Sequence, residues 1–485
     1  MSAKVSAKAS AASRLPLTSY LVVSALALPL SMIASCSSGT VGPDPYVGEF
    51  MPVNVPGCTG KCAVRTDCPV ELGGNMKLRG TVNIPAGNLP VYNARVYIPQ
   101  DVMPGKPNTG PSCDRCSNTF VATTFTSTRP DGSFELTDVP AGENIPLVIS
   151  VGKWQRIITL PKVEPCGSMN LDPDTTRLPR NQSEGNIPKI ALTTGGADAM
   201  ECLLRKSKLG IDDSEFTLPD GTGRVNLYAG GGYTNMSGVA QPASSKFAAG
   251  HNGAAAAVNL PTANPWWDTA ANWDKYDVVV MSCEGVPGAS TKSTMAKTAL
   301  KSYLDKGGRV FASHYHSEWL RLGVNPLNTV ATFAPNLTGP DPGEATIDET
   351  FDKGKALSDW LLLPNVAAST TRGLIPITQA RYSVQSIAAA APTLARSWAY
   401  YKPASGPNIT QYFSFDAPVG ADPKTQCGQM VFSDLHVSAG LDGATEDSAG
   451  PDFPSGCRSG SLSPQEKALI FMLFDLSNCL SNPIG

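Results

Sequence analysis

The fold is decided by two stretches of this 485-residue chain, Tyr276-Asp-Val-Val-Val-Met-Ser-Cys283 and Lys306-Gly-Gly-Arg-Val-Phe-Ala-Ser-His314. The apolar run in the first stretch predicts a strand over Asp277–Met281 that is buried on both faces. Thr291–Asp305 has the pattern of a helix, which the two glycines of the second stretch end. The next apolar run predicts a strand over Arg309–Ser313. A strand, a helix and a strand joined by short connections are typical of parallel strands in one sheet.

The same alternation continues over residues 188–485. Further strands are predicted at Lys189–Leu192, Val225–Tyr228, Ser397–Tyr401, Thr410–Phe415 and Met430–Ser433, and further helices at Ala197–Leu209, at 356–362 and from Ser463. The last helix begins with a capping signal, Ser463-Pro464-Gln-Glu466, and Asp198 and Glu201 have the same spacing at the first helix. Residues 230–264 are interpreted as a long loop. This half of the chain predicts an α/β domain with a doubly wound, mainly parallel sheet.

Residues 76–166 have a different pattern. Short β-type runs alternate with turn signals such as Pro130-Asp131-Gly132, which predicts an all-β, immunoglobulin-like sandwich. Residues 167–187 are polar and interrupted by prolines, so they predict a linker between the two domains. Residues 36–75 are rich in cysteine, proline and glycine and predict a tether before the sandwich.

The first residues have the features of an export signal. Basic residues precede an apolar run that ends in Ile33-Ala34-Ser35-Cys36. This end resembles the signal of bacterial lipoproteins, which implies that residues 1–35 are removed and that Cys36 carries lipid. The resemblance predicts a cell-envelope protein anchored to a membrane by acyl chains, and the serine after Cys36 favours the outer over the inner membrane. A formal charge of −3 without basic clusters argues against nucleic acid as a partner.

The chain has 12 cysteines, which in an exported protein predict disulfides. An odd number remains after Cys36, so at least one thiol has no partner within the chain. Cys113-Asp-Arg-Cys116 lies in a polar loop and is interpreted as structural rather than as a redox or zinc motif. Cys202 is a candidate partner of Cys283, and a further cross-link is expected among Cys427, Cys457 and Cys479.

Histidines gather at the ends of two predicted strands. The chain has four histidines, and three of them follow these strands, together with two carboxylates: His314, His316, Glu318, Asp434 and His436. Parallel strands end at one edge of a sheet, and ligands bind at that edge in α/β folds. The five residues therefore predict a site there.

Three interpretations of this site are open. The histidines, with Glu318 or Asp434, suit acid–base catalysis on a polar ligand such as a sugar. Alternatively, His314 and His316 share one face of an extended segment, and with Asp434 and His436 they would bind a divalent metal such as zinc. In the third interpretation, the side chains form hydrogen bonds within an inactive fold.

Two further resemblances agree with this division of the chain. Asp131-Gly-Ser-Phe-Glu-Leu136 and the runs around it resemble the carboxypeptidase regulatory-like domain, an immunoglobulin-like member of the carbohydrate-binding-like folds that has no catalytic residues. The stretches quoted first, with Asp434-Leu-His436, resemble the class I glutamine amidotransferase-like superfamily and, within it, the trehalose-utilisation (ThuA-like) family. The amidotransferase nucleophile is a cysteine on a glycine-flanked turn. This chain has Ser313-His314 there, without a flanking glycine.

The missing nucleophile favours a protein that binds without catalysis. The predicted function is that of a lipid-anchored cell-envelope protein, with a glycan or another envelope component as candidate ligand. The alternative is a carbohydrate-active hydrolase or isomerase of the ThuA-like type that uses the histidines. No cofactor is predicted apart from the zinc of the second interpretation.

Overall fold

The computed structural model describes residues 49–116, 120–205, 207–235, 237–288, 291–334, 337–388, 395–437, 450–458 and 460–480. The predicted signal peptide, the lipidation site Cys36 and the first part of the tether lie outside these residues. None of the described helices combines the length and apolar character that crossing a membrane requires.

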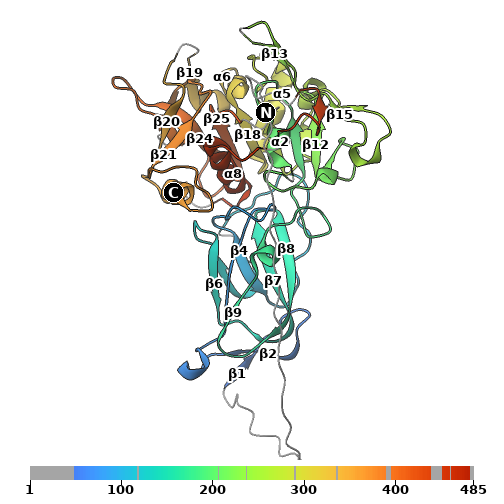
Figure 1. The fold of residues 1–485 in the computed structure, drawn as a ribbon, viewed down its shortest axis with the longest axis vertical. Coiled ribbons are helices and arrows are strands. Elements are labelled where there is room, and N and C mark those ends of the chain that lie inside the picture. Colours follow the sequence, from blue (N-terminus) through green and yellow to red (C-terminus); the bar gives the residue numbers. More distant parts are fainter. Residues whose placement is uncertain are drawn as a thin grey trace, which may run out of the picture. The chain divides into compact units, whose positions relative to one another are not determined.

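The N-terminal part of the described chain is all-β and is built from two sheets (Figure 1). The larger sheet has the order β1-β2-β7-β4-β5, with β8 beside β7, and the smaller one has the order β6-β3-β9. Every second residue of β7 from Ile145 to Val151 packs into the core, as the two-residue period of a strand requires. The strands are β1 (Phe50–Pro52), β2 (Thr59–Arg65), β3 (Lys77–Thr81), β4 (Arg95–Pro99), β5 (Ala122–Ser127), β6 (Ser133–Thr137), β7 (Ala141–Val151), β8 (Trp154–Val163) and β9 (Ser168–Asn170).

Segments on both sides of the predicted sandwich take part in it. Strands β1 and β2 belong to the predicted tether, and β2 pairs with β7. In the predicted linker 167–187, β9 pairs with β3, and Leu178 and Ile187 are fully buried. The polar composition of the linker does not reveal these contacts, because strand pairing uses the backbone and the buried apolar side chains are isolated in the sequence.

Within the described residues, the C-terminal part forms a 12-stranded sheet. One half is parallel and has the order β11-β12-β10-β17-β18-β25. The strands β24, β23, β20 and β21 continue the sheet in antiparallel fashion. The prediction of a mainly parallel sheet is therefore correct only for the half that carries the predicted site. Strands β23, β24 and β25 follow one another through loops without a crossover helix, which forces antiparallel pairing.

The strands of this sheet match the predicted runs closely in the parallel half. They are β10 (Ile190–Thr193), β11 (Phe216–Thr217), β12 (Val225–Tyr228), β17 (Val278–Met281), β18 (Arg309–Ser313), β19 (Ala331–Phe333), β20 (Gly343–Ile347), β21 (Leu374–Ile377), β22 (Val384–Ile387), β23 (Ala395–Tyr401), β24 (Ile409–Ala417) and β25 (Gly428–Ser433). The predicted loop 230–264 contains the short strands β13 (Tyr233–Thr234), β14 (Ala240–Gln241), β15 (Lys246–Phe247) and β16 (Val258–Asn259). Outside this loop, β26 (Asp452–Phe453) pairs with β15.

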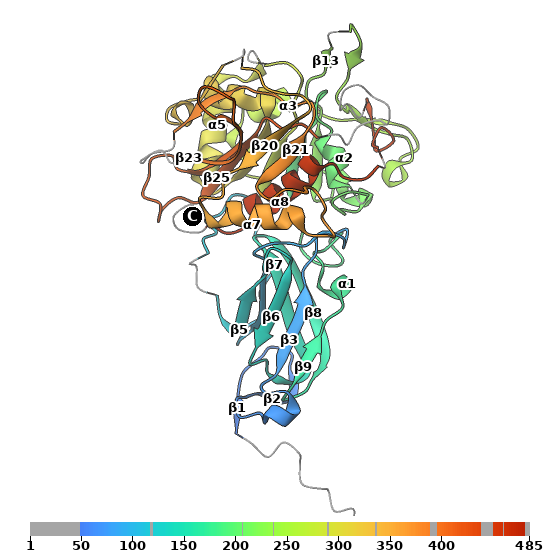
Figure 2. The same ribbon diagram turned by 60° about the vertical axis from the view of Figure 1, so that its left-hand side comes forward.

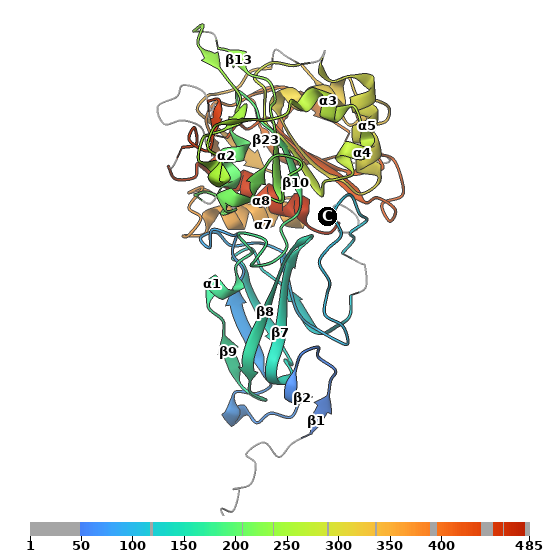
Figure 3. The ribbon, with the colours of Figure 1, turned by 90° about the vertical axis from the view of Figure 1, so that its right-hand side faces the viewer.

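Helices cover both faces of the sheet (Figure 3). Along β17, Val278 and Val280 pack in the core that contains α8, whereas Val279 and Met281 pack in the core that contains α3, α4 and α5. The strand is thus buried on both faces, as its apolar run predicts. The helices are α1 (Pro173–Thr176), α2 (Met200–Leu204), α3 (Ala263–Trp267), α4 (Ala270–Trp273), α5 (Thr294–Asp305), α6 (Glu318–Arg321), α7 (Asp352–Leu362) and α8 (Pro464–Ser477).

Helix α8 packs against both the sheet and the sandwich (Figure 2). The capping box predicted at its start is formed. Phe471 stacks on Tyr92 of the sandwich, and Phe474 packs against Trp154, with ring centroids 5.8 and 5.6 Å apart. One continuous apolar core therefore runs from the sandwich through α8 to the sheet.

Disulfides cross-link the described residues, which confirms their prediction: Cys58–Cys62, Cys68–Cys166, Cys113–Cys427, Cys116–Cys479 and Cys202–Cys457. Cys113 and Cys116 tie the sandwich to the C-terminal part. The suggested Cys202–Cys283 cross-link is wrong, because Cys202 is bonded to Cys457. The cross-link expected among Cys427, Cys457 and Cys479 is also wrong, because each of these cysteines pairs with a cysteine from an earlier part of the chain. Cys283 is the unpaired cysteine among the described residues, and it is buried.

The long-range disulfides are expected to stabilise the protein more than the local one. The Cys116–Cys479 bond spans 363 residues, so replacing both cysteines with serine should lower the free energy of unfolding by about 3–5 kcal/mol. The matched control removes Cys58–Cys62, which spans 4 residues, and should cost about 2 kcal/mol or less. Urea unfolding of both double variants measures the difference, and an equal or larger loss in the control would contradict this prediction.

Candidate functional site

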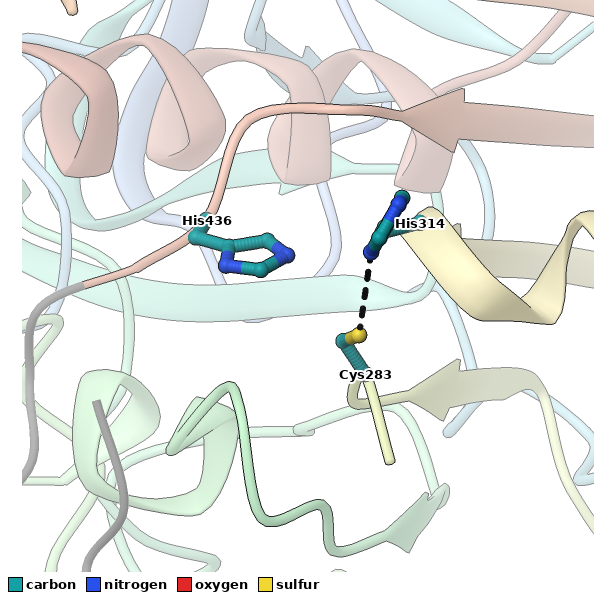
Figure 4. Close-up of side chains that lie close together, drawn as sticks. All are labelled: Cys283, His314 and His436. Atoms are coloured by element: carbon teal, nitrogen blue, oxygen red, sulfur yellow. Dashed lines mark hydrogen bonds between the residues drawn. The ribbon is translucent and has the colours of Figure 1, made fainter. Parts of the chain in front are cut away.

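Three side chains from separate strand ends converge at the carboxyl edge of the parallel half (Figure 4). Cys283 follows β17, His314 follows β18 directly and His436 follows β25, and these three strands are neighbours in the sheet. The Cys283 Sγ lies 3.5 Å from the His314 Nδ1, and the rings of His314 and His436 have centroids 5.2 Å apart. All three residues are buried, and their donor atoms lie within 4.8 Å of one another. This group, hereafter the Cys–His–His cluster, can hold a metal ion.

His314 adopts an unusual backbone conformation. Its φ is +34°, in the left-handed region that side chains other than glycine rarely enter. The chain thereby turns sharply from β18 into the helical turn over His314–Ser317. The absence of a flanking glycine does not prevent a strained turn here, because the histidine itself takes the strained conformation. Such strain is typical of functional sites.

Asp198 holds the three strand ends together. Its carboxylate accepts hydrogen bonds from the backbone N–H of Cys283 at 3.3 Å, from the backbone N–H of Val437 at 3.0 Å and from the hydroxyl of Ser313. Each donor residue is a member of the Cys–His–His cluster or is next to one in the sequence. Burial raises the pKa of Asp198 to about 7.

The predicted helix around Asp198 is shorter than expected. Helix α2 begins at Met200 without a side-chain cap, and Arg205 is already extended, so the predicted range 197–209 is too long. Asp198 does not cap the helix because its carboxylate is engaged with the strand ends. The loop before α2 lies close to Cys283, and a Cβ at Gly195 would come within 2.2 Å of the Cys283 carbonyl oxygen.

His316 is held by two protein partners outside the cluster. Its Nε2 lies 2.8 Å from the carbonyl oxygen of Ser282, and its Nδ1 accepts a hydrogen bond of 3.0 Å from the Trp319 indole. The Nε2 atom therefore carries the proton and donates it to Ser282. The predicted common face of His314 and His316 is wrong, because these residues form a helical turn rather than an extended segment.

The two predicted carboxylates also lie outside the cluster. Asp434 accepts hydrogen bonds of 2.7–2.9 Å from the backbone N–H and the hydroxyl of Ser383. Glu318 accepts two hydrogen bonds, of 2.8 and 2.7 Å, from the guanidinium of Arg321. The predicted ligand set of His314, His316, Asp434 and His436 is therefore not brought together as such.

Burial controls the protonation of the Cys–His–His cluster. It lowers the pKa of His314 to about 3 and moves the pKa of His436 well below its usual value, and the positive charge of Arg381 lowers both further. Burial also raises the pKa of the Cys283 thiol. Among the described residues, the Nε2 of His436 has no hydrogen-bond partner. The cluster thus consists of two neutral imidazoles and a thiol.

A cavity of about 530 Å³ lies at the same edge of the sheet. His314 lines it, whereas Cys283 and His436 are not part of its wall. The wall combines aromatic, charged and apolar side chains, including Tyr315, Glu318, Arg321, Phe333, Arg381 and Tyr382. Arg381 and Tyr382 are not recognisable as site residues in the sequence, because they precede a short antiparallel strand and belong to no motif.

His316 is expected to be structural. Replacing it with alanine should lower the free energy of unfolding by about 2–4 kcal/mol, because the indole of Trp319 and the carbonyl of Ser282 lose their partner and a void remains. The neighbouring Tyr315→Phe substitution removes one hydroxyl at the cavity wall and should change stability by less than about 0.5 kcal/mol. Chemical denaturation measures both, and a His316→Ala variant as stable as the control would contradict the structural role.

The chain has no match among protein-family models, curated proteins or solved structures. The resemblances to the lipoprotein, carboxypeptidase regulatory-like and amidotransferase-like families therefore remain predictions.

Proposed function

We propose that the protein is a lipid-anchored cell-envelope protein that binds a small hydroxylated ligand, such as a sugar unit of a glycan, in the cavity beside His314. The observation that carries this proposal is the composition of the cavity wall, which places aromatic rings and hydrogen-bonding groups around one space. Its position at the carboxyl ends of parallel strands agrees with an amidotransferase-like α/β fold.

The cavity suits a sugar in size and chemistry. Its volume lies within the range of about 300–1,000 Å³ that is typical of small-molecule sites. Tyr315 and Tyr382 offer rings on which the apolar face of a sugar stacks. The guanidinium of Arg381 donates through its Nη1 to the carbonyls of Gln379 and Ala380, which orients it as a hydrogen-bond donor at the wall.

The candidate catalytic residues support binding rather than catalysis. His316 and Asp434 are engaged with protein partners, and Glu318 is bound to Arg321. Cys283 is buried away from the cavity wall, and its raised pKa leaves little of the reactive thiolate.

Carbohydrate hydrolysis or isomerisation is the alternative, and the strained backbone of His314 favours it. In this case the neutral imidazole of His314 would act as the base at the cavity wall. Binding of a metal ion such as zinc is a further candidate, supported by the convergence of Cys283, His314 and His436.

The proposed binding site predicts how variants respond on a glycan array. Saccharides bound by the full-length protein should bind at least about tenfold more weakly to Arg381→Ala and Tyr382→Ala, because each removes a group of the cavity wall. Phe125→Ala on the sandwich, where the Phe125 side chain is 64% exposed, is the matched control and should bind as the unchanged protein does. If Phe125→Ala alone loses binding, the saccharide binds at the sandwich and not in the cavity, which would contradict the proposal.

The alternative is tested on the same ligands. Any saccharide that binds is incubated with the protein, and its NMR spectrum is followed over time. An unchanged spectrum supports binding without catalysis. Turnover that disappears in His314→Ala, with unchanged stability, would establish the enzyme instead.

The proposed lipid anchor predicts where the protein fractionates. Because Cys36 is the only expected acylation site, Cys36→Ala should move the protein from the membrane fraction to the soluble fraction. Immunoblotting of the two fractions measures this shift, with Cys283→Ala as a cysteine control that should stay in the membrane fraction. A Cys36→Ala variant that stays with the membrane would contradict the anchor.

A further inference from the structure

We propose that Cys283, His314 and His436 bind one thiophilic metal ion, zinc(II) or copper(I), and that Asp198 is the positioning residue of this site. The inference develops the metal-binding candidate and does not depend on a ligand in the cavity. The ligand atoms are the Sγ of Cys283, the Nδ1 of His314 and the Nε2 of His436.

The spacing of the donor atoms fits one ion. Metal–ligand lengths of about 2.0–2.3 Å place neighbouring ligand atoms roughly 3.3–3.8 Å apart. The Cys283 Sγ and the His314 Nδ1 already lie 3.5 Å apart. The His436 donor completes a group whose atoms all lie within 4.8 Å of one another, so small side-chain movements close the site.

One donor of the cluster is a buried nitrogen that no protein group in the described part of the chain satisfies. The Nε2 of His436 is buried and has no hydrogen-bond partner among the described residues, although its ring points toward His314 (Figure 4). A buried polar atom without a partner costs about 1–3 kcal/mol, and native proteins rarely leave one. A metal ion between the three donors would satisfy this nitrogen.

The thiol is also set apart from the other cysteines. Cys283 is buried and unpaired, whereas all the other described cysteines form disulfides. Its sulfur faces an imidazole nitrogen, not another sulfur. Binding would release the thiol proton as the sulfur–metal bond forms, and the two imidazoles bind in their neutral form.

Asp198 supports all three ligands through the backbone. Its carboxylate accepts hydrogen bonds from the N–H of Cys283, from the hydroxyl of Ser313, which precedes His314, and from the N–H of Val437, which follows His436. Mutating residues that hydrogen-bond to metal ligands, without binding the metal themselves, commonly lowers metal affinity by about 10–100-fold. The ligands therefore come from segments that follow three neighbouring strands and that hydrogen-bond to one shared carboxylate.

The donor set selects the class of ion. One sulfur and two imidazole nitrogens suit zinc(II) and copper(I), whereas magnesium and calcium require oxygen ligands. The buried carboxyl groups of Asp198 and Asp434 belong to the hydrogen-bond networks next to the cluster.

The test is a metal titration of the full-length protein with its disulfides intact. Zinc(II) and ascorbate-maintained copper(I) are titrated in competition with a chromophoric chelator, and cobalt(II) serves as a spectroscopic probe. We expect one ion per chain and a thiolate-to-cobalt charge-transfer band. Cys283→Ser should abolish the band, and Cys283→Ser and His436→Gln should each weaken binding at least about 100-fold. Asp198→Asn should weaken binding about 10–100-fold.

His251→Gln is the matched control, because His251 binds the carbonyl of Phe216 away from the site. It should bind metal as the unchanged protein does. Saturation by zinc or by copper(I) each supports the proposal and identifies the ion. The proposed metal site is contradicted if the unchanged protein shows no charge-transfer band, or if Cys283→Ser shows an unaltered band. Both outcomes can be read even if His436→Gln fails to fold. Saccharide binding measured on the same samples shows whether the cavity proposal stands independently.

Discussion

The buried carboxylate of Asp198 is the interaction on which the arrangement of the site depends. It connects the end of β17, the end of β18 and the segment after β25 through hydrogen bonds to Cys283, Ser313 and Val437. Burying a carboxylate costs free energy unless it is fully hydrogen-bonded. The three hydrogen bonds therefore stabilise Asp198 at its buried position. Without this connection, the three segments that follow these neighbouring strands would lose the one carboxylate that they share.

His314 belongs to both parts of the site. It lines the cavity, whose walls carry side chains suited to a polar ligand, and it is a member of the buried cluster with Cys283 and His436. The strained backbone of His314 sets this position, because it turns the chain sharply at the end of β18. A ligand in the cavity and an ion in the cluster would therefore contact the same imidazole.

The sheet that carries this edge is joined to the sandwich by apolar packing and by covalent bonds. Helix α8 packs between the sheet and the sandwich through Phe471 and Phe474, and disulfides at Cys113 and Cys116 fasten the sandwich to the C-terminal part. These cross-links agree with the export that the first residues predict. The sandwich itself carries none of the residues of the Cys–His–His cluster.

The local elements and the region of the site can be predicted from the amino-acid sequence alone. The apolar run of β17 and the capping box of α8 are short-range patterns, so they predict a buried strand and a helix start without knowledge of the fold. In contrast, the tertiary structure is needed to place Cys283 beside His314 and His436 and to place His316 outside this cluster. It is also needed to see that Asp198 does not cap a helix. These outcomes depend on strand order, on one helical turn and on contacts between residues up to 239 positions apart, such as Asp198 and Val437. The periodicity of a sequence carries no information about such contacts, because it reflects only the neighbours of a residue along its own strand or helix.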